Sequence, residues 1–221
     1  TIPVPKVLAM WEDETGDNVI IMEKIVGTTL MDSWHRMGRH QKRDVLEQIC
    51  DHFTQMRNLT WPGYFGGVMD QRCLDVFVAS CTYEGIWMDP GRMTTEDHWI
   101  TGLFNSGSTL MQKEVPLDLQ EALREEAAKE NPGVFTHGDF HPGNVMVDDH
   151  GKVFLIDWER AGWAPGYWER ALIMIGPAGI DNWADFTDEV SEILRDLRGG
   201  RPFSPPVQAI DFYYDWLQGQ R

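Results

Sequence analysis

Apolar and polar positions alternate near the start of the chain, as they do in β-strands with one buried face. Two β-like runs, Lys6–Trp11 and Asn18–Glu23, flank the polar stretch Glu12–Asp17, in which Gly16 supplies turn chemistry. The pattern predicts a β-hairpin in the first part of the chain.

After Gly27 the spacing of apolar residues changes to that of helices. A short helix is predicted over Thr29–Arg36 and a longer one over His40–Met56. The apolar face of the longer helix consists of Val45, Leu46, Ile49, Phe53 and Met56. Further helices are predicted over Glu96–Ser106, Leu117–Lys129, Trp168–Ile175, Trp183–Leu197 and Phe212–Leu217. For residues 60–95 the sequence predicts irregular structure, with a turn at GYFGG, residues 63–67.

A second hairpin is predicted in the middle of the chain. Val134–Thr136 is short and β-like, and the runs Asn144–Val147 and Lys152–Ile156 flank the turn sequence DDHG at 148–151. A small β start followed by a mainly helical body with one internal hairpin gives an α+β fold.

Composition and charge narrow the class of protein. The 221 residues are 42% hydrophobic, and the longest apolar runs fall short of the roughly 18–20 residues that span a bilayer. Three cysteines without a CxxC pair favour a reduced, cytoplasmic protein. A net charge of −16 disfavours nucleic-acid and anionic-membrane partners. It suits a cationic small-molecule substrate, and simple solubility is the alternative explanation.

Candidate chemistry gathers around the second hairpin. The segment HGDFHPGN at 137–144 has an aspartate and an asparagine at D-x4-N spacing, Asp139 and Asn144. Protein kinases use this spacing for a carboxylate that accepts the proton of the attacking hydroxyl and an amide oxygen that binds Mg²⁺. Asp157 follows the second strand of the hairpin, which returns it close to Asn144. The sequence therefore predicts a phosphoryl-transfer and metal site here.

Each part of this pattern has a simpler explanation when taken alone. His137 is more often a hydrogen-bonded structural residue than a catalyst, and His141 beside Pro142 could be an ordinary loop residue. Trp163 could form part of a substrate wall, although packing onto the helical body is the commoner fate of such aromatics. The whole combination is much harder to obtain by chance than any of its parts.

The segment resembles the aminoglycoside phosphotransferase and choline kinase-like family, whose signature is HGDxxxxN followed by an IDW or IDF element. It looks most like the fungal branch of that family. The resemblance is carried by IPVPKVL (2–8), IIMEKIVGTTL (20–30), the GYFGG turn, FTHGDFHPGNVMV (135–147) and IDWERAGWAPGYWE (156–169).

This resemblance implies a kinase-like fold that uses ATP and Mg²⁺. It implies that Asp139 is the catalytic base, that Asn144 and Asp157 bind Mg²⁺, and that Glu159 lines the acceptor pocket or is structural. The hinge that binds the adenine would consist of Met22, Glu23, Lys24 and Ile25. The acceptor would be an amino-sugar, a choline-like compound or another small alcohol.

Parts of the kinase pattern are not found in the chain. It contains no GxGxxG, and Lys6 is the only lysine before the hinge. We therefore expect residues 1–26 to be a remnant of the N-lobe and 27–221 to form the C-lobe. Either the sequence begins partway through a longer protein or the lobe is naturally reduced. Two functions stay open: a small-molecule phosphotransferase, or a non-phosphorylating protein on a truncated kinase-like scaffold.

Overall fold

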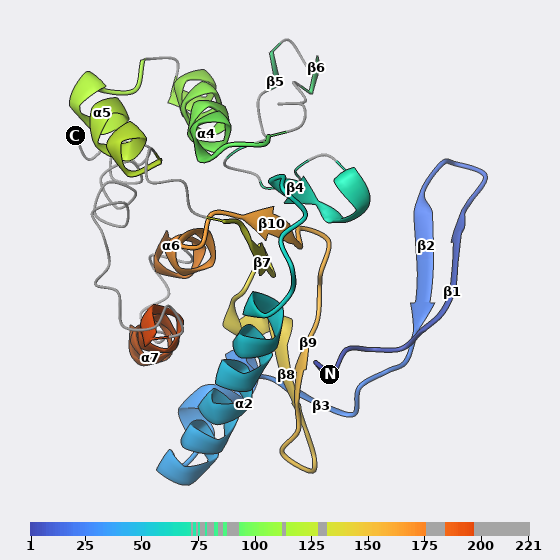
Figure 1. Cartoon of the computed structure of the whole chain (residues 1–221). Coiled ribbons are helices and arrows are strands. Elements are labelled where there is room, and N and C mark those ends of the chain that lie inside the picture. Colours follow the sequence, from blue (N-terminus) through green and yellow to red (C-terminus); the bar gives the residue numbers. More distant parts are fainter. Residues whose placement is uncertain are drawn as a thin grey trace. The chain divides into compact units, whose positions relative to one another are not determined.

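The chain forms a mixed α+β structure, as the pattern of elements predicts (Figure 1). It divides into two compact units. A computed structural model describes residues 1–71, 73, 75, 78, 82–83, 86–87, 93–111, 114–127, 132–175 and 184–196. Unit 1 comprises residues 1–55 and 141–157, and unit 2 comprises residues 56–140 and 158–221. The boundary predicted between an N-lobe remnant and a C-lobe, at residues 26 and 27, stays a prediction.

The first hairpin of unit 1 forms where the alternation predicts it. Strands β1 (Val7–Glu12) and β2 (Asn18–Met22) pair antiparallel, with Glu12 opposite Asn18. The side chain of Asp13 closes the turn, because its Oδ1 accepts hydrogen bonds from the backbone N–H groups of Thr15 and Asp17. This Asx-type closure explains why a polar stretch joins the two strands.

The second hairpin belongs to a three-stranded antiparallel sheet of unit 1. Strands β8 (Val145–Asp148) and β9 (Val153–Leu155) form the predicted hairpin, and β3 (Gly27–Thr29) adds to the other edge of β8 in the order β3-β8-β9. The sequence did not predict β3. A three-residue strand has too few positions to show a period, and its partner lies more than a hundred residues away.

One long helix supports this sheet. After α1 (Leu30–Ser33) and the 3₁₀ turn η1 (Trp34–Arg36), helix α2 spans Arg39–Arg57. The residues predicted for its apolar face are all buried. Gln48 accepts a hydrogen bond from Val153 N and donates one to Gly151 O, and His52 Nε2 lies 3.2 Å from Val153 O. Hydrogen bonds from two side chains of helix α2 to the backbone of residues 151–153 therefore tie the helix to β9 and its turn.

Unit 2 contains a second small sheet with the strand order β4-β10-β7. Its strands are β4 (Gly66–Gly67), β10 (Gly162–Ala164) and β7 (Val134–Thr136). The sequence predicted β7 but not the other two, which pair only through residues distant in sequence. Between residues 60 and 95, where irregular structure was predicted, lie the 3₁₀ turn η2 (Val68–Asp70) and a hairpin of β5 (Thr82–Tyr83) and β6 (Ile86–Trp87).

The helices described in unit 2 are α4 (Glu96–Met111), α5 (Leu117–Ala127), α6 (Trp168–Ile175) and α7 (Ala184–Asp196). Helices α4, α5 and α6 contribute residues to an aromatic-rich core. Helix α4 runs beyond the predicted end at Ser106, whereas α6 has the predicted bounds. The predicted terminal residues Trp183 and Leu197 and the predicted helix Phe212–Leu217 lie outside the described residues.

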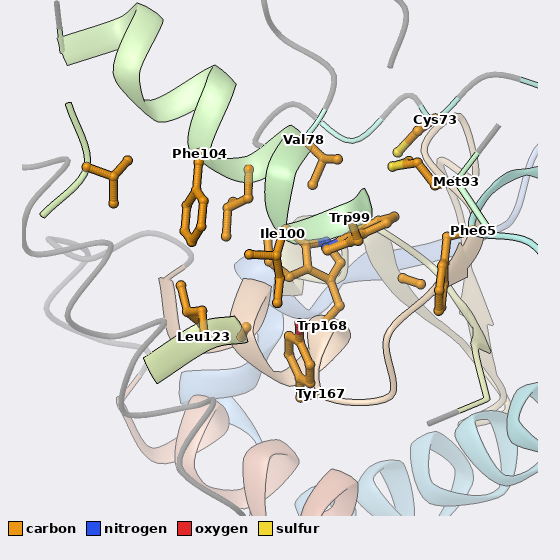
Figure 2. Packing of buried hydrophobic residues seen from close by; sticks show 14 of the residues in the cluster. Phe65, Cys73, Val78, Met93, Trp99, Ile100, Phe104, Leu123, Tyr167 and Trp168 are labelled. Atoms are coloured by element: carbon orange, nitrogen blue, oxygen red, sulfur yellow. The ribbon is translucent and has the colours of Figure 1, made fainter. Parts of the chain in front are cut away.

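The indole rings of Trp99 and Trp168 meet edge to face at the centre of this core, with ring centroids 5.3 Å apart (Figure 2). The indole Nε1 of Trp168 donates a hydrogen bond to Asp75 Oδ2. Each large aromatic side chain removes much apolar surface from water, so this cluster provides much of the stability of the unit. In the part of the chain that the structure describes, none of the helices has the length and apolarity that crossing a bilayer requires.

Candidate active site

A one-turn 3₁₀ segment leads into the hairpin that carries the predicted metal ligands. This segment, η3 (Pro142–Asn144), begins after His141, whose Nδ1 accepts a 3.0 Å hydrogen bond from Gly143 N. The backbone N–H of Asn144 donates to His141 O at 2.8 Å. Both bonds fix the turn that delivers Asn144 to the start of β8, where its side chain is buried.

The hairpin brings Asn144 and Asp157 to the same end. Val145 lies opposite Leu155, and the next backbone bond continues the ladder, with Ile156 N donating to Asn144 O at 3.0 Å. Asp157 follows directly and has a φ of 63°. Left-handed backbone at a residue other than glycine is uncommon and occurs most often at turns and functional sites. The predicted juxtaposition of these two residues is therefore present, with the aspartate in an unusual conformation and exposed.

The side chains at this hairpin end suit magnesium bound together with phosphate. No group of three or more His, Cys, Asp or Glu side chains that could hold a metal occurs within the described ranges. Asn144 and Asp157 offer hard oxygen donors, and Mg²⁺ is commonly held by one or two carboxylates together with phosphate oxygens and water. The donor set fits a magnesium–nucleotide complex better than a metal held by protein side chains alone.

Asp139 lies in unit 2, after strand β7, and has a cationic neighbour. Arg160 Nη1 is 3.5 Å from Asp139 Oδ1, and the two side chains are 30% and 27% exposed. The Asp139 N–H donates to His137 Nδ1 at 3.3 Å. Gly138 between them has a φ of +80°, and a Cβ there would lie 2.3 Å from Arg160 O. The backbone of the HGD segment therefore packs directly against the backbone of Arg160, which leaves no room for a side chain at position 138.

His137 is completely buried among aromatic rings. Its imidazole lies 4.6 Å, centroid to centroid, from the Trp158 ring and meets Phe140 edge to face. With Nδ1 also accepting the Asp139 N–H, the ring supports the loop from inside. This environment favours a structural role for His137 over a role in contact with a substrate.

Glu169, the second residue of helix α6, also belongs to this site and was not predicted from the sequence. Its carboxylate is 1% exposed and accepts hydrogen bonds from His137 N and, at 3.3 Å, from Gly138 N. Burial raises the pKa of Glu169 from 4.5 to about 7, although the two hydrogen bonds and nearby Arg57 act in the opposite direction. The sequence contained one signal of this burial. Glu169 lies four positions before Ile173, so the two residues share the buried face of an apolar helix.

The residues predicted to bind substrate and adenine are spread over both units. Glu159 is exposed, with its Oε1 3.6 Å from Arg160 Nε, and Trp163 in β10 packs edge to face on Phe135. Met22 ends β2 with its side chain exposed, and Glu23 N donates to Lys6 O at 2.8 Å. Lys24 is exposed and Ile25 half-buried. The roles of these residues stay predictions.

Comparison with known proteins identifies the family. Residues 1–203 match the model of the phosphotransferase enzyme family, APH, so the chain belongs to this family. The resemblance seen in the sequence motifs is thereby confirmed at the level of the family, while the fungal branch and the reduced N-lobe stay predictions. No curated protein matches the chain at a significant level.

Solved structures establish the kinase-like fold of the aminoglycoside phosphotransferases. Aminoglycoside phosphotransferase APH(4)-Ia matches with a TM-score of 0.60 and 17% identity over 98% of this chain and 68% of that chain. A thermostable mutant of this protein, in a ternary complex with ADP and hygromycin B, matches with a TM-score of 0.59 and 18% identity over the same shares of the two chains. APH(3'')-Id from Streptomyces rimosus matches with a TM-score of 0.54 and 19% identity, over 98% of this chain and 75% of its own. The predicted kinase-like fold is confirmed.

Proposed function

We propose that the protein transfers the γ-phosphoryl group of ATP to a hydroxyl of a small molecule, with Mg²⁺ as cofactor. The observation that carries this proposal is the hairpin end at which Asn144 and the left-handed Asp157 meet, directly after an HGD-x4-N segment. Membership of the phosphotransferase family supports it, as do neighbours solved with ADP or AMP-PNP and hygromycin B. The acidity of the chain favours an acceptor that carries amino groups.

Each residue then has a stated task. Asp139 orients the acceptor hydroxyl and takes its proton as the oxygen attacks the γ-phosphorus and ADP departs. Asn144 and Asp157 would hold Mg²⁺, which when bound offsets the negative charge on the phosphates. The backbone of residues 22–25 binds the adenine. Glu159, His141 and Trp163 line the acceptor side.

Replacement of the proposed base tests the reaction. Asp139→Asn keeps the shape of the side chain but removes the proton acceptor, so phosphate transfer should fall by about 10²–10⁴-fold. Transfer from radiolabelled ATP is measured with a panel of amino-sugar and amino-alcohol acceptors. Asp149→Asn, an exposed residue in the β8–β9 turn, is the matched control and should retain full activity.

Nucleotide binding separates this function from a non-phosphorylating scaffold. Millimolar Mg-ATP should raise the melting temperature of the wild type, because a ligand that binds only the folded state stabilises it. Asp157→Ala should lose the magnesium-dependent part of the shift. Undiminished turnover in Asp139→Asn would overturn the assignment of the base, and a wild type that neither binds Mg-ATP nor transfers phosphate would overturn the proposed function.

A further inference from the structure

Arg160 lies beside the proposed base, and the proposed reaction gives it no role. Its Nη1 is 3.5 Å from Asp139 Oδ1, and its Nε is 3.6 Å from Glu159 Oε1. Both distances are too long for good hydrogen bonds. Ion pairs between partly exposed side chains add little to stability, so these two contacts do not explain why an arginine lies at this position.

The backbone of Arg160 is fixed by its surroundings. Ala161 N donates to Trp158 O at 3.0 Å and closes a turn that contains Arg160. A Cβ at Gly138 would lie 2.3 Å from Arg160 O and 3.1 Å from Arg160 Cβ, so the HGD backbone packs directly against the start of this side chain. These contacts determine the point from which the guanidinium reaches Asp139. Its place beside the base is therefore set by the backbone.

The hydrogen-bonding capacity of the guanidinium exceeds what the described residues use. An arginine side chain carries five N–H donors in a planar fork. Among the residues that the structure describes, its two charged contacts are looser than hydrogen bonds, and its Nη2 has no carboxylate partner. At 30% exposure the side chain is accessible to a small molecule. A planar fork of this kind matches a carboxylate, whose two oxygens accept two parallel N–H bonds.

We propose that Arg160 determines acceptor specificity by binding a carboxylate that the acceptor carries close to the hydroxyl to be phosphorylated. This inference rests on the proposed function, because it takes Asp139 as the base. The transfer itself is unchanged: the hydroxyl oxygen bonds to the γ-phosphorus of ATP, ADP leaves, and the hydroxyl proton goes to Asp139. Because Nη1 and Oδ1 are only 3.5 Å apart, the hydroxyl and the carboxylate are attached to the same carbon or to adjacent carbons.

The acceptor class that fits is an amino hydroxy acid. The net charge of −16 favours an acceptor with an amino group, and the exposed carboxylate of Glu159 beside Arg160 suits an ammonium. A zwitterion provides a partner for both Glu159 and Arg160. An amino alcohol instead brings its ammonium close to the guanidinium and leaves the guanidinium without an anionic ligand, which disfavours it.

Three acceptors that differ only in a carboxylate test the inference with the whole chain and Mg-ATP. Ethanolamine has no carboxylate, isoserine has one on the carbon that bears the hydroxyl, and serine has one on the next carbon. In the wild type, kcat/KM for serine or isoserine should exceed that for ethanolamine by about 10–100-fold. Arg160→Gln should lose this preference, mainly through a higher KM. Arg160→Lys keeps the charge without the fork and should retain part of the preference.

Arg43 of helix α2, in unit 1, is the matched control. Its guanidinium also contacts two carboxylates, 3.5 Å from Asp44 and 3.6 Å from Glu47, and Arg43→Gln should keep the wild-type preference. A wild type that does not prefer the carboxylate-bearing acceptors overturns the inference, and so does an Arg160→Gln variant that keeps the preference. An equal loss with all three acceptors also overturns it, because the guanidinium then acts on the phosphoryl group that all three receive.

Chemical modification of the wild type tests the inference without turnover and without a variant that must fold. Phenylglyoxal reacts with accessible guanidinium groups, and peptide mass spectrometry follows its reaction with Arg160 and Arg43 in one sample. Serine or isoserine should slow the modification of Arg160 but not that of Arg43, and ethanolamine should slow neither. Absence of protection, or an Arg160 that the reagent does not modify, overturns the inference. Protection in a protein that transfers no phosphate supports the carboxylate site and counts against the proposed function.

Discussion

The two hairpins of unit 1 have the same kind of turn and opposite surroundings. In the β1–β2 turn, Asp13 Oδ1 accepts from the N–H groups of Thr15 and Asp17, and in the β8–β9 turn, Asp148 Oδ1 accepts from those of His150 and Lys152. Each turn has a left-handed glycine three residues after its aspartate. The local rule that reverses the chain is therefore the same in both.

Burial distinguishes the two hairpins. Every residue of β1 is exposed, including Leu8 at 62% and Met10 at 68%, whereas buried and half-buried residues alternate along β8 and β9. The β8–β9 hairpin is also held by β3 on one side and by Gln48 and His52 of helix α2 on the other. Turn chemistry decides where the chain reverses, and packing decides how firmly the far end of the hairpin is held. The proposed metal ligands lie on the firmly held hairpin.

The largest contrast should come from matched leucine truncations. Leu155 in β9 is fully buried, so Leu155→Ala should lower the free energy of unfolding by about 2–5 kcal/mol through lost burial and a cavity. Leu8→Ala in β1 should change it by less than about 0.5 kcal/mol. Urea unfolding followed by tryptophan fluorescence measures both. Similar losses in the two variants would show that the exposed hairpin is packed in solution.

A smaller contrast should come from the polar contact between helix α2 and β9. Gln48→Ala leaves the N–H of Val153, a fully buried residue, without its acceptor, and should cost about 1–3 kcal/mol. Glu47→Ala on the exposed side of the same helix should stay within about 0.5 kcal/mol. The same urea experiment compares them. A neutral Gln48→Ala would mean that this side chain does not stabilise β9 and that its pairing with β8 suffices.

The smallest effects should come from the two turn aspartates. Hydrogen bonds, chiefly from the Thr15 side chain, lower the pKa of Asp13 below 3.8. Hydrogen bonds, chiefly from Lys152 N, lower the pKa of Asp148 in the same way. The stability they add is present above pH 3.8 and is lost as the pH falls through their lowered pKa values. At neutral pH, Asp148→Ala should lower the melting temperature slightly, and Asp13→Ala should only speed amide exchange at Thr15 and Asp17. Loss of global stability in Asp13→Ala at neutral pH would contradict this.

Long periodic elements and side-chain-closed turns were predictable from the sequence. Helix α6 has the predicted bounds, and both hairpins reverse at their polar turns. Strands β3, β4 and β10 were not predictable, because two or three residues show no period and their partners are distant in sequence. The contacts of Glu169 and Arg160 were missed for a related reason. From the sequence alone, both residues would be predicted to be charged surface residues. Their contacts with the HGD segment become visible only in the folded structure.

At Asp157, which has a left-handed backbone, the residue that is best for stability differs from the residue that the proposed activity needs. Glycine adopts a φ of 63° more readily than aspartate, so Asp157→Gly would relieve backbone strain at this position. The same replacement would delete a proposed magnesium ligand. A laboratory evolution campaign that rewards heat resistance alone would therefore drift toward an inert protein, and one that rewards turnover would retain the strained aspartate.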